Sequence, residues 1–170
     1  MEYILFTGTW RITNQEVEKD VRKAVRDVFA SGKGVLTGGA TGVDYFCMDE
    51  ALKIDPTGKS LMVLIPAFLE DYINDYYTNW LKYPVKKEDV DSTADILRKF
   101  KKLNPSNFVE APNKIITPKD FDIRSEEEVK VASGVYAFHV NDSIGTQYTL
   151  DYAVSKKVPI LLHKKYNITV

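Results

Sequence analysis

Short runs of consecutive apolar residues alternate with longer stretches in which apolar residues recur every three or four positions. The short runs predict strands that are buried on both faces of a parallel sheet. These predicted strands are residues 3–6, 34–36, 61–65, 135–140 and 158–162. The longer stretches predict amphipathic helices. These predicted helices are residues 17–29, 43–54, 68–81, 88–103, 122–133 and 146–156. The alternation indicates an α/β fold, a three-layer sandwich around a five-stranded parallel sheet with right-handed crossovers.

Between the third and fourth predicted strands, residues 67–119 form a longer segment than one crossover requires. We expect a helical insertion that ends in a loop at residues 108–119, within which Ile115 and Ile116 could form a short strand. A lid, an oligomer arm and an elaborated sheet edge are all compatible with this segment. Its aromatic residues have near-helical spacing, which favours packing or an oligomer contact over base stacking. These residues are Tyr72, Tyr76, Tyr77, Trp80 and Tyr83.

Composition and charge limit the class of protein. The length of 170 residues suits a single domain over residues 1–170, and a net charge of −1 gives no general attraction to nucleic acid or to an anionic membrane. Because Cys47 is the only cysteine, an internal disulfide and a cysteine-based metal cluster are excluded. His139 and His163 favour structural roles, so no metal site is expected. Without a leader-like start or an apolar run of about 20 residues, we expect a cytoplasmic protein with no membrane partner.

A glycine-rich turn follows the second predicted strand and precedes a predicted helix. Residues 37–44 have the sequence Thr-Gly-Gly-Ala-Thr-Gly-Val-Asp. Glycine lets a ligand approach the backbone closely, and the start of a helix presents unpaired N–H groups that favour a phosphate. We therefore predict a phosphate site here, although a tight turn without a ligand is the alternative. The candidate ligand-binding residues are Gly38, Gly39, Ala40, Thr41 and Gly42. The pattern is neither the dinucleotide fingerprint nor a P-loop.

Two further polar turns end predicted strands, at residues 7–11 and 141–146. Ligands of open parallel sheets bind at the carboxyl ends of the strands, where the strand order reverses. If the first, second and fourth strands are neighbours, all three turns meet at one crevice. The additional candidate ligand-binding residues are Gly8, Thr9, Arg11, Asn141, Ser143, Gly145 and Thr146. Arg11 suits a phosphate as a bidentate donor, but an exposed arginine after a strand is often only solvated.

Three charged residues have both a functional and a structural interpretation. Asp44 could accept from a ribose hydroxyl or act as a general base, or it could only favour the start of its helix. Asp142 is a second candidate base, but we favour its role as a helix cap. Arg124 could bind a ligand, or it could form a local salt bridge to Glu127 or Glu128. Asp44 and Asp142 are thus the catalytic candidates if the protein is an enzyme.

The glycine turn resembles the glycine motif of the SLOG superfamily of Rossmann-like nucleotide-binding proteins. Residues 36–44 carry this resemblance, and the second half of the chain is similar to the ending of the same group. The matching parts of that ending are Arg124, Ala132, Ser143-Ile144-Gly145-Thr146, Ala153 and Val158-Pro159-Ile160. The group includes the DNA-processing protein A recombination mediators and the LOG cytokinin-activating phosphoribohydrolases. The resemblance covers residues 1–66 and 121–163. It implies a Rossmann-like sheet of order 3-2-1-4-5 and a homo-oligomer. It also implies a nucleotide ligand that Arg124 contacts.

The sequence departs from the LOG motif Pro-Gly-Gly-x-Gly-Thr-x-x-Glu, whose glutamate serves the chemistry. Asn141-Asp142-Ser143 stands in place of Pro-Gly-Gly, and Thr149 occupies the position of the glutamate. Our leading hypothesis is therefore a protein that binds a nucleotide or a nucleotide-derived phosphate compound, with no cofactor besides that ligand. A nucleotide N-glycosidase that uses Asp44 or Asp142 is the first alternative. A single-stranded DNA-binding module is the second, although the net charge does not favour a nucleic acid partner.

Overall fold

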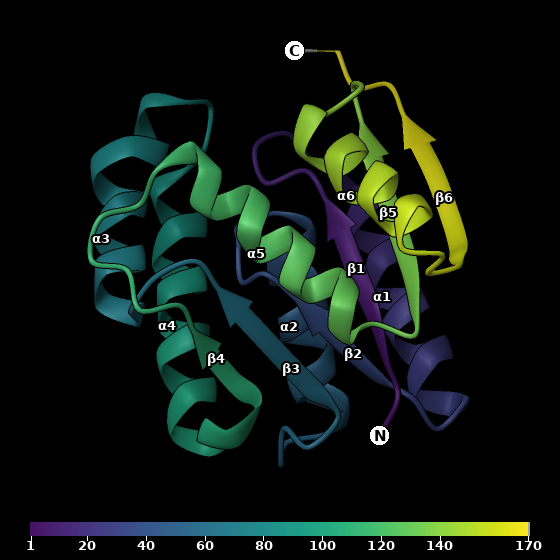
Figure 1. The fold of residues 1–170 in the computed structure, drawn as a ribbon. Helices are drawn as coiled ribbons and strands as arrows, with labels where there is room; N and C mark the ends of the chain where they lie inside the picture. Colours follow the sequence, from purple (N-terminus) through teal and green to yellow (C-terminus); the bar gives the residue numbers. More distant parts are fainter. Residues whose placement is uncertain (170) are drawn as a thin grey trace.

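A computed structural model describes residues 1–169 of the chain. In this part of the chain six parallel strands form one sheet, in the order β4-β3-β2-β1-β5-β6 (Figure 1). The strands are β1 (Tyr3–Gly8), β2 (Gly34–Thr37), β3 (Leu61–Ile65), β4 (Phe108–Glu110), β5 (Gly134–Val140) and β6 (Ile160–Tyr166). The helices are α1 (Gln15–Ala30), α2 (Val43–Ile54), α3 (Leu69–Asn79), α4 (Lys87–Leu103), α5 (Pro118–Val131) and α6 (Ile144–Ser155). Two 3₁₀ turns are η1 (Trp80–Lys82) and η2 (Pro105–Asn107).

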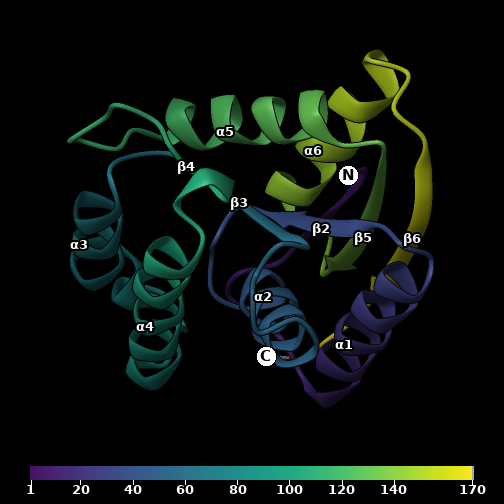
Figure 2. The ribbon, with the colours of Figure 1, turned by 90° about the horizontal axis from the view of Figure 1, so that it is seen from below.

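The sheet lies between two helical layers, as Figure 2 shows from its edge. α5 and α6 cover one face, whereas α1 and α2 cover the other, with α3 and α4 on the same side beyond β3. Successive strand residues point to opposite faces. Ile4 and Phe6 pack in the core on the α1 and α2 side, and Leu5 packs in the core on the α5 and α6 side. Burial on both faces explains why continuous apolar runs correctly predicted parallel strands.

The sheet has six strands, so the prediction of five was wrong. β4 pairs with β3 in parallel, with Val63 opposite Phe108 and Ile65 opposite Glu110. A strand of three residues with only Phe108 buried has too few apolar positions to differ from a loop in the sequence. The short strand suggested at residues 115–116 is not formed, and the side chain of Ile115 is exposed. The other five strands keep the expected order, here as β3-β2-β1-β5-β6.

The largest boundary differences from the sequence pattern are four residues, at the start of α5 and at the end of β6, and the first of them changes the site. α5 begins at Pro118, because Thr117 and Asp120 form a capping box around its first turn. Arg124 therefore lies in the second turn of α5 and not at its start. β6 begins two residues later and ends four residues later than predicted, at Tyr166. Within residues 1–169, no helix combines the length and the apolar character that crossing a membrane requires.

The aromatic part of the insertion packs into the core. Tyr72 and Tyr76 are fully buried, with ring centroids 4.5 Å apart, and the ring of Trp80 packs at a tilt of 52° against Tyr76, with 4.3 Å between the centroids. The hydroxyl of Tyr76 donates to the carbonyl oxygen of Gly39, which connects α3 to the glycine turn. These contacts confirm the packing role expected for the tyrosines of α3 that face inward.

Gly8 ends β1 at a point where α2 packs closely against the sheet. A Cβ atom at this position would lie 2.5 Å from Cγ2 of Val43 and 2.7 Å from the carbonyl oxygen of Phe138. We expect Gly8→Ala to lower the free energy of unfolding by about 1–3 kcal/mol, because a buried side chain and a strand backbone must move. Urea denaturation followed by circular dichroism measures this loss. Gly145→Ala is the control, since no atom lies within 4 Å of a Cβ there, and an equal loss in both variants would contradict the prediction.

Candidate functional site

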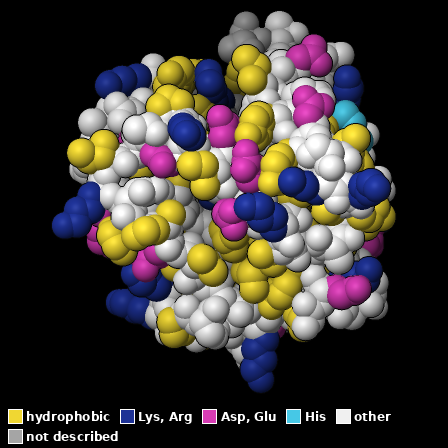
Figure 3. Space-filling view, in the orientation of Figure 1, with side chains coloured by type: hydrophobic (Ala, Val, Ile, Leu, Met, Phe, Trp, Pro, Cys, Tyr) yellow, Lys and Arg dark blue, Asp and Glu magenta, His cyan; other side chains and the backbone are white. Residues whose placement is uncertain are grey.

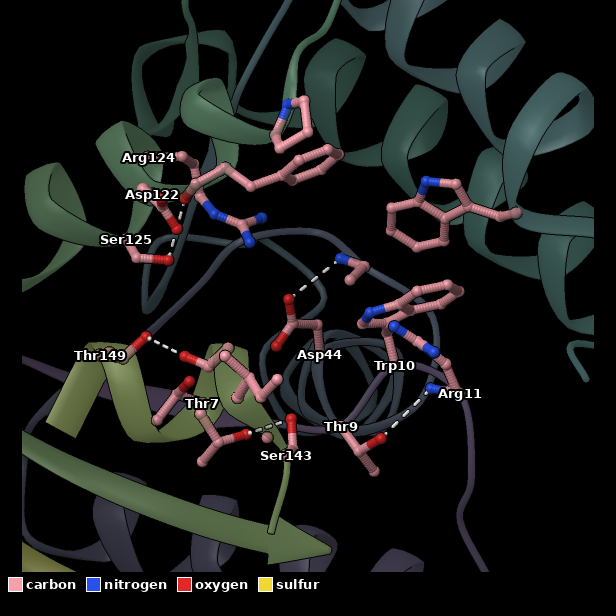
Figure 4. A pocket seen from close by; sticks show the side chains of 18 of the residues that line it. Thr7, Thr9, Trp10, Arg11, Asp44, Asp122, Arg124, Ser125, Ser143 and Thr149 are labelled. Atoms are coloured by element: carbon pink, nitrogen blue, oxygen red, sulfur yellow. Dashed lines mark hydrogen bonds between the residues drawn. The ribbon is translucent and has the colours of Figure 1, made fainter. Parts of the chain in front are cut away.

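A cleft of about 780 Å³ opens at the carboxyl ends of β1 and β5 (Figure 4). Its walls come from the turns after these two strands, the start of α6, the N-terminal half of α5 and the region around η1. The strand order reverses at this point, because β2 and β5 flank β1 on its two sides. Open parallel sheets bind ligands at such a reversal. The cleft therefore lies where the turns of the sequence were expected to meet.

Most of the predicted ligand-binding residues line this cleft. The lining residues are Gly8, Thr9, Arg11, Ala40, Asp44, Arg124, Asn141, Ser143, Gly145 and Thr146. The candidate base Asp142 also lines it. Four predicted residues do not line the cleft, namely Gly38, Gly39, Thr41 and Gly42. Thr41 and Gly42 border a smaller cavity of about 240 Å³ on the other side of the segment that holds Trp10 and Arg11.

The glycine turn is engaged by the protein itself. The N–H of Ala40 donates to Oδ2 of Asp44 at 3.0 Å, and the N–H of Val43 donates to the carbonyl oxygen of Thr9 at 3.1 Å. A Cβ atom on Gly38 would collide with the guanidinium of Arg124, so this glycine makes room for an arginine. Two N–H groups of the turn are thus occupied by the protein itself, and the phosphate contact expected for Gly38, Gly39, Thr41 and Gly42 stays a prediction.

The start of α6 is the more accessible helix terminus. Ser143 is its N-cap residue and makes no side-chain cap hydrogen bond, so the expected cap by Asp142 is wrong. Asn141 and Asp142 precede it with φ angles of 48° and 52°, in the left-handed region. Gly145, in the first turn, is exposed and has open space beside it. The first N–H groups of a helix have no partner within the helix, so this terminus can accept an anion from the cleft.

Aromatic side chains form the opposite wall of the cleft. Trp10 and Trp80 have ring centroids 4.5 Å apart, and Tyr83 meets Trp10 edge-on at 5.4 Å. The guanidinium of Arg11 lies over both Trp10 and Tyr83, at 4.7 Å and 4.5 Å from the ring centroids. Phe121 of α5 continues this wall. Sequence reasoning missed Trp10 as a site residue and assigned Trp80 to packing, because spacing along the chain does not show which ring edge faces a cavity.

A buried charged group forms the floor of the cleft. Nη1 of Arg124 donates to the carbonyl oxygen of Gly38 at 2.8 Å, and its Nε lies 3.7 Å from Oε2 of Glu128. Burial raises the pKa of Glu128 to about 8, although the charge of Arg124 opposes this effect. Burial also raises the pKa of Asp44, against Arg124 and the N–H of Ala40. Glu128 was missed as a site residue, since an acid four positions from an arginine usually indicates only a local helix pair.

The two histidines and the cysteine contact other parts of the protein in ways that fit structural roles. His139 is buried, and its Nε2 lies 3.0 Å from the carbonyl oxygen of Ser143, to which it must donate. Its Nδ1 lies 3.2 Å from Nε2 of His163. Burial raises the pKa of the Cys47 thiol, which lies in the core. Within residues 1–169, no group of three or more His, Cys, Asp or Glu side chains is placed to hold a metal ion.

No protein-family model and no curated protein sequence matches the chain. DNA processing protein A from Helicobacter pylori, which is described by its single-stranded DNA binding mode, aligns with a TM-score of 0.64 and 16% identity. This alignment covers 94% of the chain but only 63% of that protein. The structural genomics protein TM1055 aligns with a TM-score of 0.55 and 15% identity, covering 94% of the chain and 72% of TM1055. The similarities show that the chain shares the Rossmann-like α/β fold of these two structures.

The buried carboxyl of Glu128 predicts a specific pH dependence of stability. An unfolded glutamate ionises near pH 4.3, whereas Glu128 in the folded protein keeps its proton until about pH 8. Between these two pH values, unfolding therefore releases the proton of Glu128. The contribution of Glu128 to stability falls as the pH rises from about 4.3 to about 8. Glu128→Gln removes the ionisation, so its stability relative to the parent protein should rise by more than about 1 kcal/mol from pH 5 to pH 9. Urea denaturation at both pH values measures this difference.

The matched control for this prediction is Glu127→Gln, whose side chain is half-exposed and pairs with Lys130. Its stability relative to the parent protein should change little with pH. A constant difference between Glu128→Gln and the parent protein across the same range would show that Glu128 ionises in the folded protein as an ordinary glutamate does.

Proposed function

We propose that the cleft binds a nucleotide or a nucleotide-derived phosphate compound, with the phosphate at the start of α6 and the base against the aromatic wall. The observation that carries the proposal is the presence of both recognition elements in one cavity, at the reversal of the strand order. The volume of about 780 Å³ lies within the range of roughly 300–1,000 Å³ that is typical of small-molecule sites.

The phosphate end is supported by the chemistry of the α6 terminus. Free N–H groups and the positive end of the helix dipole favour an anion. The hydroxyl of Thr146 donates to the hydroxyl oxygen of Ser143 at 3.3 Å, which leaves the hydrogen of Ser143 free to donate to a phosphate oxygen. Gly145 leaves the approach open. This terminus replaces the glycine turn as the proposed phosphate site.

The base end is supported by the aromatic wall, in which Trp10 and Tyr83 are partly exposed and the buried Trp80 packs against Trp10. Stacking on aromatic rings stabilises nucleobases by about 1–3 kcal/mol per base, and it tolerates all bases because each has a π face. Arg11 lies over two of these rings and can extend the stack through its planar guanidinium. The proposal therefore includes Trp10 and Tyr83 as base contacts, in addition to the residues predicted from the sequence.

We favour a mononucleotide over a single-stranded DNA segment, although the similar protein from Helicobacter pylori is described as binding single-stranded DNA. Five acidic residues line the cleft, against two arginines. The acids are Asp44, Asp75, Asp122, Glu128 and Asp142. Acidic side chains also gather over α5 near the middle of the face in Figure 3. A phosphodiester backbone is attracted by clustered Lys and Arg, and this cleft does not present such a cluster.

Tryptophan fluorescence provides a direct test, because the two tryptophans of the chain both line the cleft. We expect that at least one of AMP, GMP, CMP and UMP quenches this fluorescence and that inorganic phosphate does not. Gly145→Glu should weaken the binding at least tenfold, since it adds a carboxylate beside the phosphate site without a steric clash. Val154→Glu adds the same charge at an exposed position of the same helix and should bind as the parent protein does. Equal effects of the two variants would place the phosphate elsewhere.

The buried acids favour one second candidate, hydrolysis of the N-glycosidic bond of a nucleotide. A carboxyl that keeps its proton, Glu128, and an acid held near a guanidinium, Asp44, are the kind of pair that serves as general acid and base. Asp142 is exposed and has no such partner among the described residues. Under this hypothesis, incubation with the four monophosphates releases a free base, detected by chromatography, and Glu128→Gln abolishes the release. Absence of release with all four would exclude this reaction for them.

A further inference from the structure

The floor of the cleft contains a polar recess between Asp44, Arg124 and Glu128. α5 presents Arg124 and Glu128 one helical turn apart, and the first turn of α2 presents Asp44 from the other side. Figure 4 shows the side chains of Asp44 and Arg124 pointing into the same space. The recess is separate from the α6 terminus and from the aromatic wall, so the two recognition elements of the proposed function leave it unused.

Two buried polar atoms of the recess lack a hydrogen-bond partner among the described residues. They are Nε of Arg124 and Oε1 of Glu128, and the exposed fraction of Glu128 is only 4%. The distance of 3.7 Å between Nε of Arg124 and Oε2 of Glu128 is too long for a hydrogen bond. Buried polar groups are normally hydrogen-bonded, because an unpaired group loses its hydration without compensation. The recess therefore contains two polar atoms for which the described residues provide no partner.

The charges of Asp44, Arg124 and Glu128 determine which kind of ligand group the recess favours. The negative charge of Asp44 compensates the positive charge of Arg124, and burial keeps a proton on Glu128 at neutral pH. A phosphate would face two carboxyl groups here, and an ammonium group would face a guanidinium, so both meet a like charge. A neutral hydroxyl group avoids this repulsion, because it accepts from an N–H group and donates to a carboxyl oxygen. Two adjacent hydroxyl groups can form hydrogen bonds with Arg124 and Glu128 at the same time.

We propose that this recess binds the vicinal diol of a ribose, in the same ligand whose phosphate binds at the start of α6. The inference rests on the proposed function, since a ribose joins the phosphate to the base in a nucleotide. It narrows the ligand class to ribonucleotides, and it assigns to Glu128 the discrimination against a sugar that lacks the 2′-hydroxyl group.

Isothermal titration calorimetry tests this inference with AMP, GMP, CMP, UMP and their 2′-deoxy counterparts. We expect every ribonucleotide that binds to bind about tenfold or more tightly than its deoxy counterpart, because deoxygenation leaves the buried groups unpaired. Glu128→Met keeps a similar side-chain volume and removes the buried carboxyl, and its circular dichroism spectrum and melting temperature verify that it folds. It should lower the affinity for the ribonucleotide to that for the deoxynucleotide, and it should change the affinity for the deoxynucleotide less than twofold. Glu127→Gln, on the outer side of α5, should preserve the full discrimination.

Equal affinities of the parent protein for ribonucleotides and deoxynucleotides would overturn the inference. The same conclusion would follow if Glu128→Met weakened both classes by the same factor, since Glu128 would then not contact the 2′-hydroxyl group. If none of the eight nucleotides binds, the proposed function fails, and the recess is tested alone with millimolar ribose and 2-deoxyribose. A rise in melting temperature with ribose only, absent in Glu128→Met, would support the recess, and no difference between the two sugars would overturn it.

Discussion

The hydrogen bond from the buried guanidinium of Arg124 to the carbonyl oxygen of Gly38 is the contact on which the cleft depends. It joins α5 to the turn between β2 and α2, two parts of the chain that are 86 residues apart. An arginine cannot lose its charge when it is buried, so its surroundings must supply acceptors and compensating charge. Gly38 supplies the acceptor, and Asp44 supplies the compensating charge from α2. Once this group is fixed, the floor of the cleft is polar and close to neutral.

This contact also explains the glycine-rich sequence of residues 37–44. Gly38 leaves space for the guanidinium of Arg124. The next residue, Gly39, accepts a hydrogen bond from the hydroxyl of Tyr76 in α3. A glycine shows that something approaches the backbone closely, but it does not show whether a ligand or the protein itself approaches. The partner here is an arginine far along the chain, which local spacing cannot reveal. The turn after β5 was easier to interpret, because its polar residues remain at the surface of the cleft.

The sequence predicted a strand or helix correctly where buried apolar residues recur along the whole length of that element. Five strands, all helices and the reversal between β1 and β5 follow from apolar runs, helical periodicity and the resemblance in the two motifs. β4 could not be predicted, because its pairing with β3 depends on main-chain contacts and buries only Phe108. Glu128 and Trp80 could not be assigned to a site for a related reason. Their roles depend on how α5 and η1 converge on β1, and this is a property of the assembled layers.

The start of α6 is held in place by contacts that act before any ligand arrives. Two consecutive residues in the left-handed region, Asn141 and Asp142, store strain that persists only where neighbouring contacts enforce it. The side chain of Asn141 both donates to and accepts from the backbone of Ile168, at 2.8 Å in each case. Nε2 of His139 donates a hydrogen bond to the carbonyl oxygen of Ser143. These bonds fix the direction in which the first N–H groups of α6 point. Because the charges on the floor compensate one another, the fixed backbone dipole at this terminus is the strongest feature of the cleft for attracting an anion.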